Sequence, residues 1–432
     1  MNSNAAAQHS SPLVSPALRD KLVALFGPDH VRPASPANAL SGVHPQLILE
    51  PTTEQQLAAA LRIASEAGLA VIPRGGGTKL SWGNPPLRAD LILSTTRLKQ
   101  IVEHAWADLT VIVEAGCTIQ KLQQTLAQHG QLLALDPLWP EEATVGGVLS
   151  TNDSGALRLR FGALRDLIIG VTIALPDGTL ASSGGKVVKN VAGYDLPKLV
   201  TGALGTLGVI TRAVFRLHPL PHGSRSFSIP AANPDEAQEL VLGIQDSKLA
   251  HVALQSRFSG DAPPSIDILF EGTESGLDAQ AIHLRALCRS QQISEVSSEI
   301  WSARQDLWSF SNPEETAIVK TSTLPADLGR TVELFRRSTN SAQVCWKSLM
   351  YATGLGWLRL EGRPDDLHRT LATLRADVER MGGSLVLLHR PATLPPFDAW
   401  GTPGDSLGLM KAVKRQLDPA NTLNPGRFLG GI

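Results

Sequence analysis

Three consecutive glycines, Gly75 to Gly77, directly follow a short apolar run that ends at Pro73. Because glycine has no Cβ, such a stretch turns sharply and lets backbone N–H groups approach a ligand closely. Successive N–H groups in a glycine-rich turn form a concave, partly positive surface that suits a pyrophosphate. A tight loop without a ligand explains this stretch equally well on its own. The spacing matches neither the dinucleotide motif G-x-G-x-x-G nor the phosphate-binding P-loop.

Length and composition favour a multidomain globular protein. A chain of 432 residues is expected to form two or three domains. With 43% hydrophobic residues, 18% charged residues and a net charge of −1, nothing indicates binding to nucleic acid or to an anionic membrane. Cys117, Cys288 and Cys345 are far apart and form no C-x-x-C pair, so a reducing compartment and small buried thiols are expected.

The N-terminal residues Met1 to Ser10 have neither a basic start nor an apolar core, so they do not resemble a signal peptide. No apolar run reaches the length that spans a bilayer. We therefore expect a cytoplasmic protein without direct membrane insertion, in which any membrane contact is made through partner subunits.

Local patterns place the glycines at the end of a β–α–β unit. Gln46 to Glu50 is predicted as a strand, and a helix starts near Thr53 with Leu57, Leu61 and Ala64 at helical spacing. Ala70 to Pro73 is the next strand and leads into the glycines. Further strands are predicted at 90–94, 100–105, 110–114 and 209–217, and Thr118 is expected to cap a helix that runs to Gln128.

The second half mixes helical and strand patterns, which indicates an α+β domain. Helices are predicted at 235–245, 277–288, 366–381 and 406–417, and strands at 266–270, 317–320, 356–360 and 384–389. The proline-rich segment His218 to Pro221 marks the expected boundary. The predicted organisation is an extension at 1–40, partly disordered, a first domain at 41–220, a second at 221–400, and a helix and tail at 401–432 that return to the first domain.

Five stretches occur in an order that resembles a known family. They are the glycine loop, Thr144-Val-Gly-Gly147, Val188 to Leu196, Gly205 to Thr211, and the tail Leu423-Asn-Pro-Gly-Arg427. Together they resemble the FAD-linked oxidases with a PCMH-type (vanillyl-alcohol-oxidase-like) flavin domain. Within that family, the chain is most similar to the FAD-binding E subunits of glycolate oxidase. Residues 45–220 carry the similarity strongly, and the remainder carries it more loosely.

The resemblance implies a PCMH-type FAD-binding fold of two α+β subdomains, followed by an α+β cap domain with a mainly antiparallel sheet. FAD would lie between the subdomains with its pyrophosphate on the glycine loop. The implied cofactor-binding residues are Pro73, Arg74, Gly75, Gly76, Gly77, Thr78, Asp136, Thr144, Gly146, Gly147, Ser150, Asn190, Tyr194, Val209 and Ile210. For Asp136, Asn190 and Tyr194, turn and packing roles carry equal weight.

Two departures from the family pattern affect the chemistry. Members that bind flavin covalently commonly carry histidine directly after the glycines, where this chain has Thr78, so we predict non-covalent FAD. Dehydrogenases of the family also carry two histidine-rich stretches that hold a metal and a base. Aligned on their glycines, those positions are Ala352, Arg359 and Leu388 here, so no metal is expected, and His389 remains.

His389 and Arg359 are the candidate catalytic residues. A histidine can act as a general base, and an arginine can bind a carboxylate through two parallel hydrogen bonds. A strand-end histidine without a catalytic role is the simpler interpretation of His389.

The resemblance implies a FAD-binding subunit of a glycolate oxidase complex, which oxidises a small 2-hydroxy acid and passes electrons on. A sister FAD subunit and an iron–sulfur subunit would be its partners. A stand-alone 2-hydroxy-acid (D-lactate-type) dehydrogenase is the alternative. A structural subunit with little flavin chemistry is a third interpretation, for which tryptophans of the second half such as Trp301 and Trp308 would mark an interface.

Overall fold

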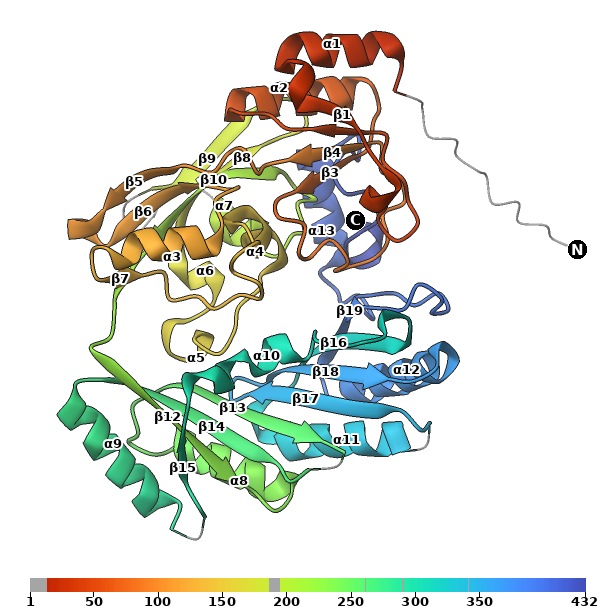
Figure 1. Cartoon of the computed structure of the whole chain (residues 1–432). Helices are drawn as coiled ribbons and strands as arrows, with labels where there is room; N and C mark the ends of the chain where they lie inside the picture. The colour runs from red at the N-terminus through yellow and green to blue at the C-terminus, as the bar shows by residue number, and fades with distance from the viewer. Residues whose placement is uncertain (1–13, 186–194, 261, 290, 341) are drawn as a thin grey trace, which may run out of the picture.

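The computed structural model describes residues 14–185, 195–260, 262–289, 291–340 and 342–432. Figure 1 shows two halves, one above the other in this view. The first half of the chain forms the upper part, and the green-to-blue second half forms a broad sheet below it. The last helix, α13 (Leu407–Leu417), lies in the upper half beside β3, so the C-terminal segment returns to the first half of the chain.

The first sheet of the upper half has the order β1-β2-β4-β3. Its strands are β1 (Val31–Pro33), β2 (Leu47–Leu49), β4 (Leu91–Ser94) and β3 (Val71–Arg74), with β2 and β3 both parallel to β4. Helices α1 (Pro16–Phe26) and α2 (Glu54–Glu66) pack on it. The Thr53 side chain accepts a hydrogen bond from the Gln56 N–H and starts α2, while Leu57 and Leu61 bury its inner face.

The second sheet of the upper half has the order β5-β6-β10-β8-β9 and is antiparallel throughout. Its strands are β5 (Ile101–Ala105), β6 (Thr110–Glu114), β10 (Val209–Arg216), β8 (Ile168–Ala174) and β9 (Leu180–Gly184). The helices of this part are α3 (Ile119–Ala127), α4 (Val145–Thr151), α5 (Arg158–Phe161), α6 (Leu164–Leu167) and α7 (Leu196–Val200). A two-stranded sheet pairs β7 (Gln131–Leu132) with β11 (His218–Pro219).

The lower half is an eight-stranded antiparallel sheet with the order β15-β12-β14-β13-β17-β18-β16-β19. Its strands are β12 (Gly223–Pro230), β13 (His251–Ser259), β14 (Ser265–Gly272), β15 (Ser294–Val296), β16 (Thr316–Ser322), β17 (Cys345–Tyr351), β18 (Leu355–Glu361) and β19 (Ser384–His389). Helices α8 (Pro234–Gln245), α9 (Glu274–Leu287), α11 (Leu328–Asn340) and α12 (Pro364–Arg380) share one hydrophobic cluster with the sheet. Helix α10 (Ala303–Asp306) lies on the side of the sheet that faces the upper half in Figure 1.

The α+β fold class predicted from the sequence is confirmed. The predicted helices at 235–245, 277–288, 366–381 and 406–417 correspond to α8, α9, α12 and α13. The stretch Thr144-Val-Gly-Gly147 forms the N-cap and first turn of α4. The predicted motif at 188–196 lies mostly outside the described residues.

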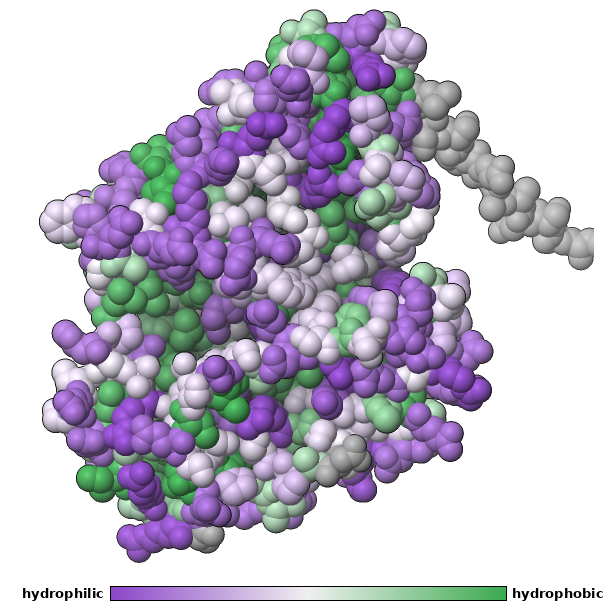
Figure 2. All heavy atoms as spheres, viewed as in Figure 1, coloured by the Kyte–Doolittle hydropathy of each residue, from purple (hydrophilic) through white to green (hydrophobic). Residues whose placement is uncertain are grey.

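The surface view in Figure 2 shows mainly hydrophilic side chains on this face, with hydrophobic residues gathered at the left where the two halves meet. None of the helices that the structure describes combines the length and the apolar character needed to cross a bilayer.

Candidate FAD-binding site

The glycine loop follows β3 and packs against the turn before α4. A Cβ on Gly75 would overlap the Thr144 hydroxyl, and a Cβ on Gly76 would overlap the carbonyl oxygen of Glu142. Gly77 has a φ of +81°, a backbone conformation that favours glycine. Close backbone approach therefore requires glycine at positions 75 and 76, and the backbone conformation favours glycine at position 77. Together the three glycines let the loop pack closely against Thr144 and Glu142.

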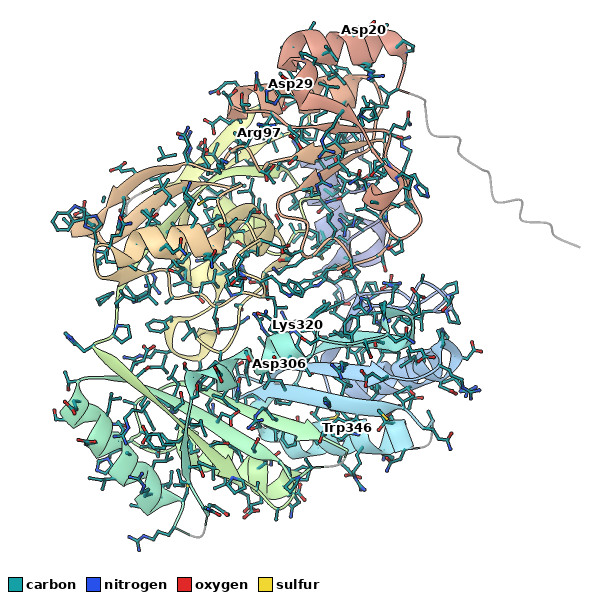
Figure 3. All side chains as sticks on the ribbon, viewed as in Figure 1. Asp20, Asp29, Arg97, Asp306, Lys320 and Trp346 are labelled. Atoms are coloured by element: carbon teal, nitrogen blue, oxygen red, sulfur yellow. The ribbon has the colours of Figure 1, made fainter. Side chains whose placement is uncertain are left out.

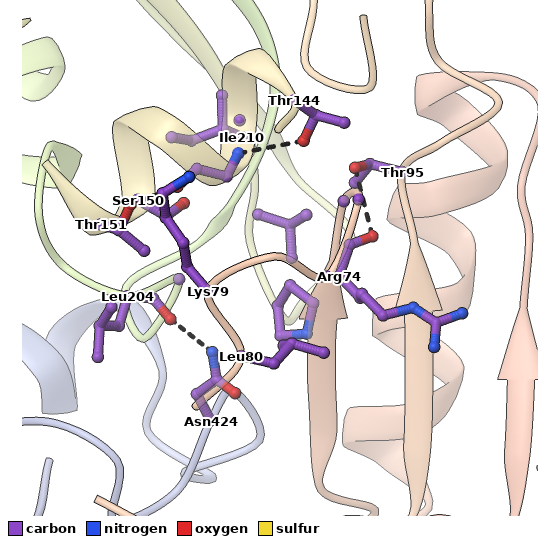
Figure 4. Close-up of a pocket in the computed structure, with 18 of the residues that line it drawn as sticks. Arg74, Lys79, Leu80, Thr95, Thr144, Ser150, Thr151, Leu204, Ile210 and Asn424 are labelled. Carbon is purple, nitrogen blue, oxygen red and sulfur yellow. Dashed lines mark hydrogen bonds between the residues drawn. The ribbon is translucent and has the colours of Figure 1, made fainter. Parts of the chain in front are cut away.

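The loop forms one wall of a pocket with an empty volume of about 680 Å³. Figure 4 shows the side chains that surround it. Among the predicted cofactor-binding residues, those that line the pocket are Pro73, Arg74, Gly75, Gly76, Gly77, Thr78, Thr144, Gly146, Gly147, Ser150, Val209 and Ile210. None of the described residues accepts a hydrogen bond from the backbone N–H groups of Gly75 to Thr78. The wall therefore offers several adjacent free donors, which suits an anionic ligand.

The start of α4 forms the opposite wall. Thr144 caps this helix, and its hydroxyl accepts a hydrogen bond from the Gly147 N–H at 3.4 Å. The next N–H groups are already used, because Val145 donates to the Cys117 carbonyl and Gly146 donates to the Ala115 carbonyl. Gly146 thus serves close packing against Ala115, where a Cβ would lie 2.9 Å from the alanine side chain.

The C-terminal tail closes a third side of the pocket with Asn424 and Arg427. The tail runs beside β3: the Val71 N–H donates to the Thr422 carbonyl at 2.7 Å, and the Asn424 N–H donates to the Val71 carbonyl at 3.0 Å. Arg427 donates to the carbonyl oxygens of Leu80 and Trp82 on the far side of the glycine loop. Burial lowers the pKa of Arg427 to about 10.

Arg74 lines the pocket, but its guanidinium points away from the other lining side chains in Figure 4. Burial, followed by the charge of Arg32, lowers its pKa, and Glu50 partly offsets this. Thr78, at the position where covalent members carry histidine, has no side-chain atom suited to a covalent flavin bond. Its hydroxyl accepts a hydrogen bond from the Lys79 ammonium at 3.4 Å.

One described residue among the predicted cofactor residues, Asp136, does not line this pocket. Asp136 is buried next to it, where its carboxylate accepts hydrogen bonds from the N–H groups of Gly155 and Leu157. Burial raises the pKa of Asp136, and Arg304 and these N–H groups partly offset the rise. Asn190 and Tyr194 lie outside the described residues.

A buried ion-pair cluster joins this pocket to the lower half. Asp153 accepts from Lys79 at 3.2 Å and from Arg304, on α10, at 2.9 Å. Arg304 also donates to the carbonyls of Ser154 and Asp136. Burial alone would raise the pKa of Asp153, but Arg304, Lys79 and the Leu138 N–H together hold it below its ordinary value. We call this junction the Asp153 cluster (Lys79, Asp153, Arg304).

The two predicted catalytic residues lie on the large sheet, outside the lining of the FAD pocket. His389 ends β19, where its Nε2 lies 3.4 Å from the Pro313 carbonyl and its ring packs on Phe310. Burial lowers its pKa, and the Pro313 carbonyl and Glu314 partly offset this. Arg359 is buried; it donates to the Asp306 and Ser309 carbonyls and pairs with Glu361 at 3.0 Å. Its guanidinium is thus already bound by protein groups.

Other lining residues were not predicted from the sequence. They are Lys79, Leu80, Thr95, Thr151, Leu204, Gly205, Gly208, Asn424 and Arg427. Some of these residues lie within or next to the sequence motifs described above. Lys79 and Leu80 follow the glycines, Gly205 and Gly208 belong to the 205–211 stretch, and Asn424 and Arg427 belong to the tail. Thr95, which follows β4 and reaches the pocket because β4 pairs with β3, carries no local signal.

This geometry agrees with the comparisons with known proteins. Residues 45–184 match the family model of the FAD binding domain. This match is to a FAD-binding domain, and FAD is the cofactor. The chain is 25% identical over 421 residues to glycolate oxidase subunit GlcD of Bacillus subtilis, which covers 89% of each chain. It is 33% identical over 209 residues to D-lactate dehydrogenase of Archaeoglobus fulgidus, which covers 48% of this chain and 46% of the relative.

The fold is shared with solved structures of low sequence identity. An alkyldihydroxyacetonephosphate synthase superposes with a TM-score of 0.76 at 17% identity, over 97% of this chain and 87% of that one. At this identity the likeness concerns the fold alone.

The residues present fit FAD. The free N–H groups of the glycine loop supply donors for a pyrophosphate, and the contacts of Gly75 and Gly76 leave no room for side chains there. Val209 and Ile210, at the start of β10, add an apolar wall. A long ligand with one anionic segment and one apolar segment matches this combination of walls.

Proposed function

We propose that this protein is a FAD-dependent oxidoreductase that oxidises a small 2-hydroxy acid, as a flavoprotein subunit of a glycolate oxidase type complex. The observation that carries the proposal is the donor-rich pocket at Gly75 to Thr78, in a chain similar along most of its length to a glycolate oxidase subunit. When bound, FAD would supply the two-electron acceptor for the substrate.

The chain's own residues would hold the cofactor by complementary contacts. The backbone of Gly75 to Thr78 would bind the pyrophosphate, Thr144 and Ser150 would contact the ribityl side, and Val209 and Ile210 would pack on the apolar part. Because Thr78 cannot form a histidyl–flavin bond, the FAD would be non-covalent. We expect the mass of the denatured protein to show no flavin adduct, and an adduct would contradict this assignment.

The substrate would meet the cofactor at the junction of the two halves, where the Asp153 cluster and the upper face of the large sheet adjoin the pocket. His389 is a candidate base at this junction. Arg359 is the weaker candidate for binding the carboxylate, because Glu361 and two carbonyls already occupy its guanidinium.

The proposed partners are a sister FAD subunit and an iron–sulfur subunit that accepts the electrons. Ala352, Arg359 and Leu388 occupy the positions where metal and base residues of the family lie, which favours an E-type subunit that relays electrons while a sister subunit oxidises most of the substrate. The similarity to a D-lactate dehydrogenase favours the alternative, a stand-alone dehydrogenase.

The deciding experiment is anaerobic mixing of the purified, FAD-loaded chain with glycolate or D-lactate, followed at the visible flavin absorption. Rapid bleaching by either acid supports a dehydrogenase that works alone. A flavin that stays oxidised with every acid, but is reduced once the partner subunits are added, supports the relay subunit. A flavin stoichiometry near one per chain contradicts a purely structural subunit.

A further inference from the structure

One cation at the junction of the two halves, Lys320, has no ion-pair or hydrogen-bond partner among the described residues, although the Asp153 carboxylate acts on it from beyond contact distance. Lys320 lies on β16, and Figure 3 shows it between the upper and lower halves. Its ammonium lies 5.6 Å from the ring centroid of Trp357 on the neighbouring strand. Trp357 packs in the same cluster as Trp82, Leu138 and Ala156 of the upper half, so this face of the sheet meets the FAD-binding half. No carboxylate or carbonyl of the described residues lies within bonding distance of the Lys320 Nζ.

The two lysines that are fully buried among the described residues are paired, whereas the Lys320 side chain is only partly buried. The Lys79 ammonium has Asp153 and the Leu138 carbonyl, and the Lys414 ammonium has Asp418 and two carbonyls. Partial burial removes part of the water around the Lys320 ammonium, and no carboxylate in direct contact replaces it, so the charged form of the amine is destabilised. Ionisable groups with shifted pKa values are frequent at functional sites.

Charged groups from every element around Lys320 act on its amine. They are Asp153 on the segment after α4, Arg158 on α5 and Arg304 on α10, and His389 lies on the adjacent strand β19. The pKa of Lys320 is lowered to about 8: burial is the largest influence, Asp153 partly offsets it, and Arg304 and Arg158 add to the lowering. A substantial fraction of the amine is thus uncharged near pH 8 and can accept a proton.

A continuous set of contacts connects Lys320 with the cofactor pocket. Lys79 lines that pocket and pairs with Asp153, which binds Arg304. The Arg304 guanidinium lies 5.1 Å from the Trp357 ring, and the Lys320 ammonium lies against the same ring. The amine therefore lies where the large sheet meets the FAD-binding half, connected to the pocket through Trp357, Arg304, Asp153 and Lys79.

We propose that Lys320 is a catalytic residue, the proton acceptor for the substrate hydroxyl; this assignment rests on the proposed oxidation of a 2-hydroxy acid. The uncharged Nζ takes the hydroxyl proton and becomes an ammonium. The C2–H bond breaks, its electron pair leaves with the hydrogen as hydride to oxidised FAD, and the C2–O bond becomes a carbonyl. The acid is oxidised by two electrons to a 2-oxo acid, and FAD is reduced by two.

Lys320 fits this role better than the two residues expected from the sequence. The His389 ring is packed on Phe310 with its Nε2 next to the Pro313 carbonyl, and the Arg359 guanidinium is held by Glu361 and backbone carbonyls. Neither side chain needs an external ligand to complete its contacts, whereas the Lys320 amine has no hydrogen-bond partner among the described residues.

The first test measures stability, independently of turnover, on the full FAD-loaded chain. If Lys320 is held with a pKa below that of a free lysine, its charge destabilises the fold at neutral pH, and the penalty disappears as the pH rises from about 8 to about 10.4. Lys320→Met should therefore unfold at higher temperature than wild type at pH 7, and this difference should shrink by pH 10. Lys347→Met, an exposed lysine on β17 of the same sheet, is the matched control and should show no such dependence.

The second test follows flavin reduction by glycolate and D-lactate in a stopped-flow instrument. Wild type should react faster as the pH rises through about 8. Lys320→Met and Lys320→Arg should both be slower by about a hundredfold to ten-thousandfold and lose this pH dependence, because arginine keeps the charge but does not accept a proton at these pH values.

The outcomes separate the two proposals. If wild type is reduced and Lys320→Met or Lys320→Arg is reduced as fast, Lys320 is not the proton acceptor, although the proposed oxidation stands. A stability difference between Lys320→Met and wild type that does not change with pH also overturns the assignment. If no 2-hydroxy acid reduces the wild-type flavin, alone or with partner subunits, the proposed function fails, and the assignment fails with it.

Discussion

The missing side chain of Gly76 is as important to the FAD pocket as any side chain that lines it. The backbone at Gly76 lies directly against the Glu142 carbonyl, so a methyl group there must displace one of the two chains. Overpacking of this kind costs about 1–3 kcal/mol. We expect Gly76→Ala to weaken FAD binding by about tenfold to a hundredfold, because the displaced loop no longer presents its N–H groups together.

The matched control for that substitution is Gly243→Ala. Gly243 is a helical, exposed glycine of α8 with open space around its ideal Cβ, and alanine there should stabilise the helix by about 0.5–1 kcal/mol. Titration of apo-protein with FAD, read by quenching of flavin fluorescence, measures both variants. Equal FAD affinities of Gly76→Ala and Gly243→Ala would mean that FAD binding does not depend on the backbone path of the glycine loop.

The sequence predicted some of the residues that line this pocket and missed others. The three glycines and Thr144 carry a local signal, since close backbone approach leaves no other residue type at such positions. Thr95 and Leu204 carry none, because β-sheet pairing and the turn before β10 bring them to the pocket. Arg359 illustrates the opposite failure: a buried arginine is a reasonable carboxylate ligand in a sequence, but its intramolecular partners become visible only in the fold.

At the scale of elements, periodicity found four helices of the second half and missed other elements, among them β17 and α11. In β17, exposed and buried residues alternate only from Cys345 to Ser348, and Leu349 to Tyr351 are all buried, so the strand lacks a sustained alternation. The inner face of α11 includes Thr331 and Thr339, whose hydroxyls donate to backbone carbonyls four residues earlier, and these polar residues interrupt the apolar pattern.

The contact between the segment after α4 and helix α10 depends on Asp153. Asp153→Asn would leave Lys79 and Arg304 buried without a counter-charge, and losing one partner of a buried ion pair costs about 3–5 kcal/mol. Urea unfolding of the variant measures this loss. Glu333→Gln on α11, which removes an exposed pair with Arg336, is the control and should change little. Similar stabilities for the two variants would contradict a structural role for the cluster.

The stability that the ionised Asp153 contributes depends on pH. Because the folded-state pKa of Asp153 lies below its unfolded value of about 3.9, its ionisation stabilises the fold above that value, and the stabilisation is lost as the pH falls through the folded pKa. The stability difference between wild type and Asp153→Asn should therefore be constant from pH 5 to 7 and shrink below about pH 4. Unfolding curves at each pH give this difference, and a difference that grows with acid would be inconsistent with the lowered pKa.

At the scale of the whole molecule, the chain leaves the FAD-binding half, builds the large sheet and then returns to complete the pocket. The return is fixed by Lys414 on α13, whose ammonium pairs with Asp418 at 2.6 Å and donates to the carbonyls of Thr206 and Leu423. Asp418 in turn accepts from the N–H groups of Thr422 and Leu423. One buried ion pair thus positions the segment that carries Asn424 and Arg427 to the pocket.

Lys414→Met should release this tail while the two halves remain folded. We expect FAD affinity to fall by about tenfold or more. Losing one partner of a buried ion pair costs about 3–5 kcal/mol, and about 1.4 kcal/mol of this cost already corresponds to a factor of ten in affinity. Lys411→Met, an exposed lysine one turn earlier on the same helix, is the matched control and should bind FAD as wild type does. Limited proteolysis should cleave the C-terminal segment faster in Lys414→Met alone. If that variant keeps both its FAD affinity and its protection, the tail is held by Arg427 and its two carbonyls, and the ion pair is dispensable.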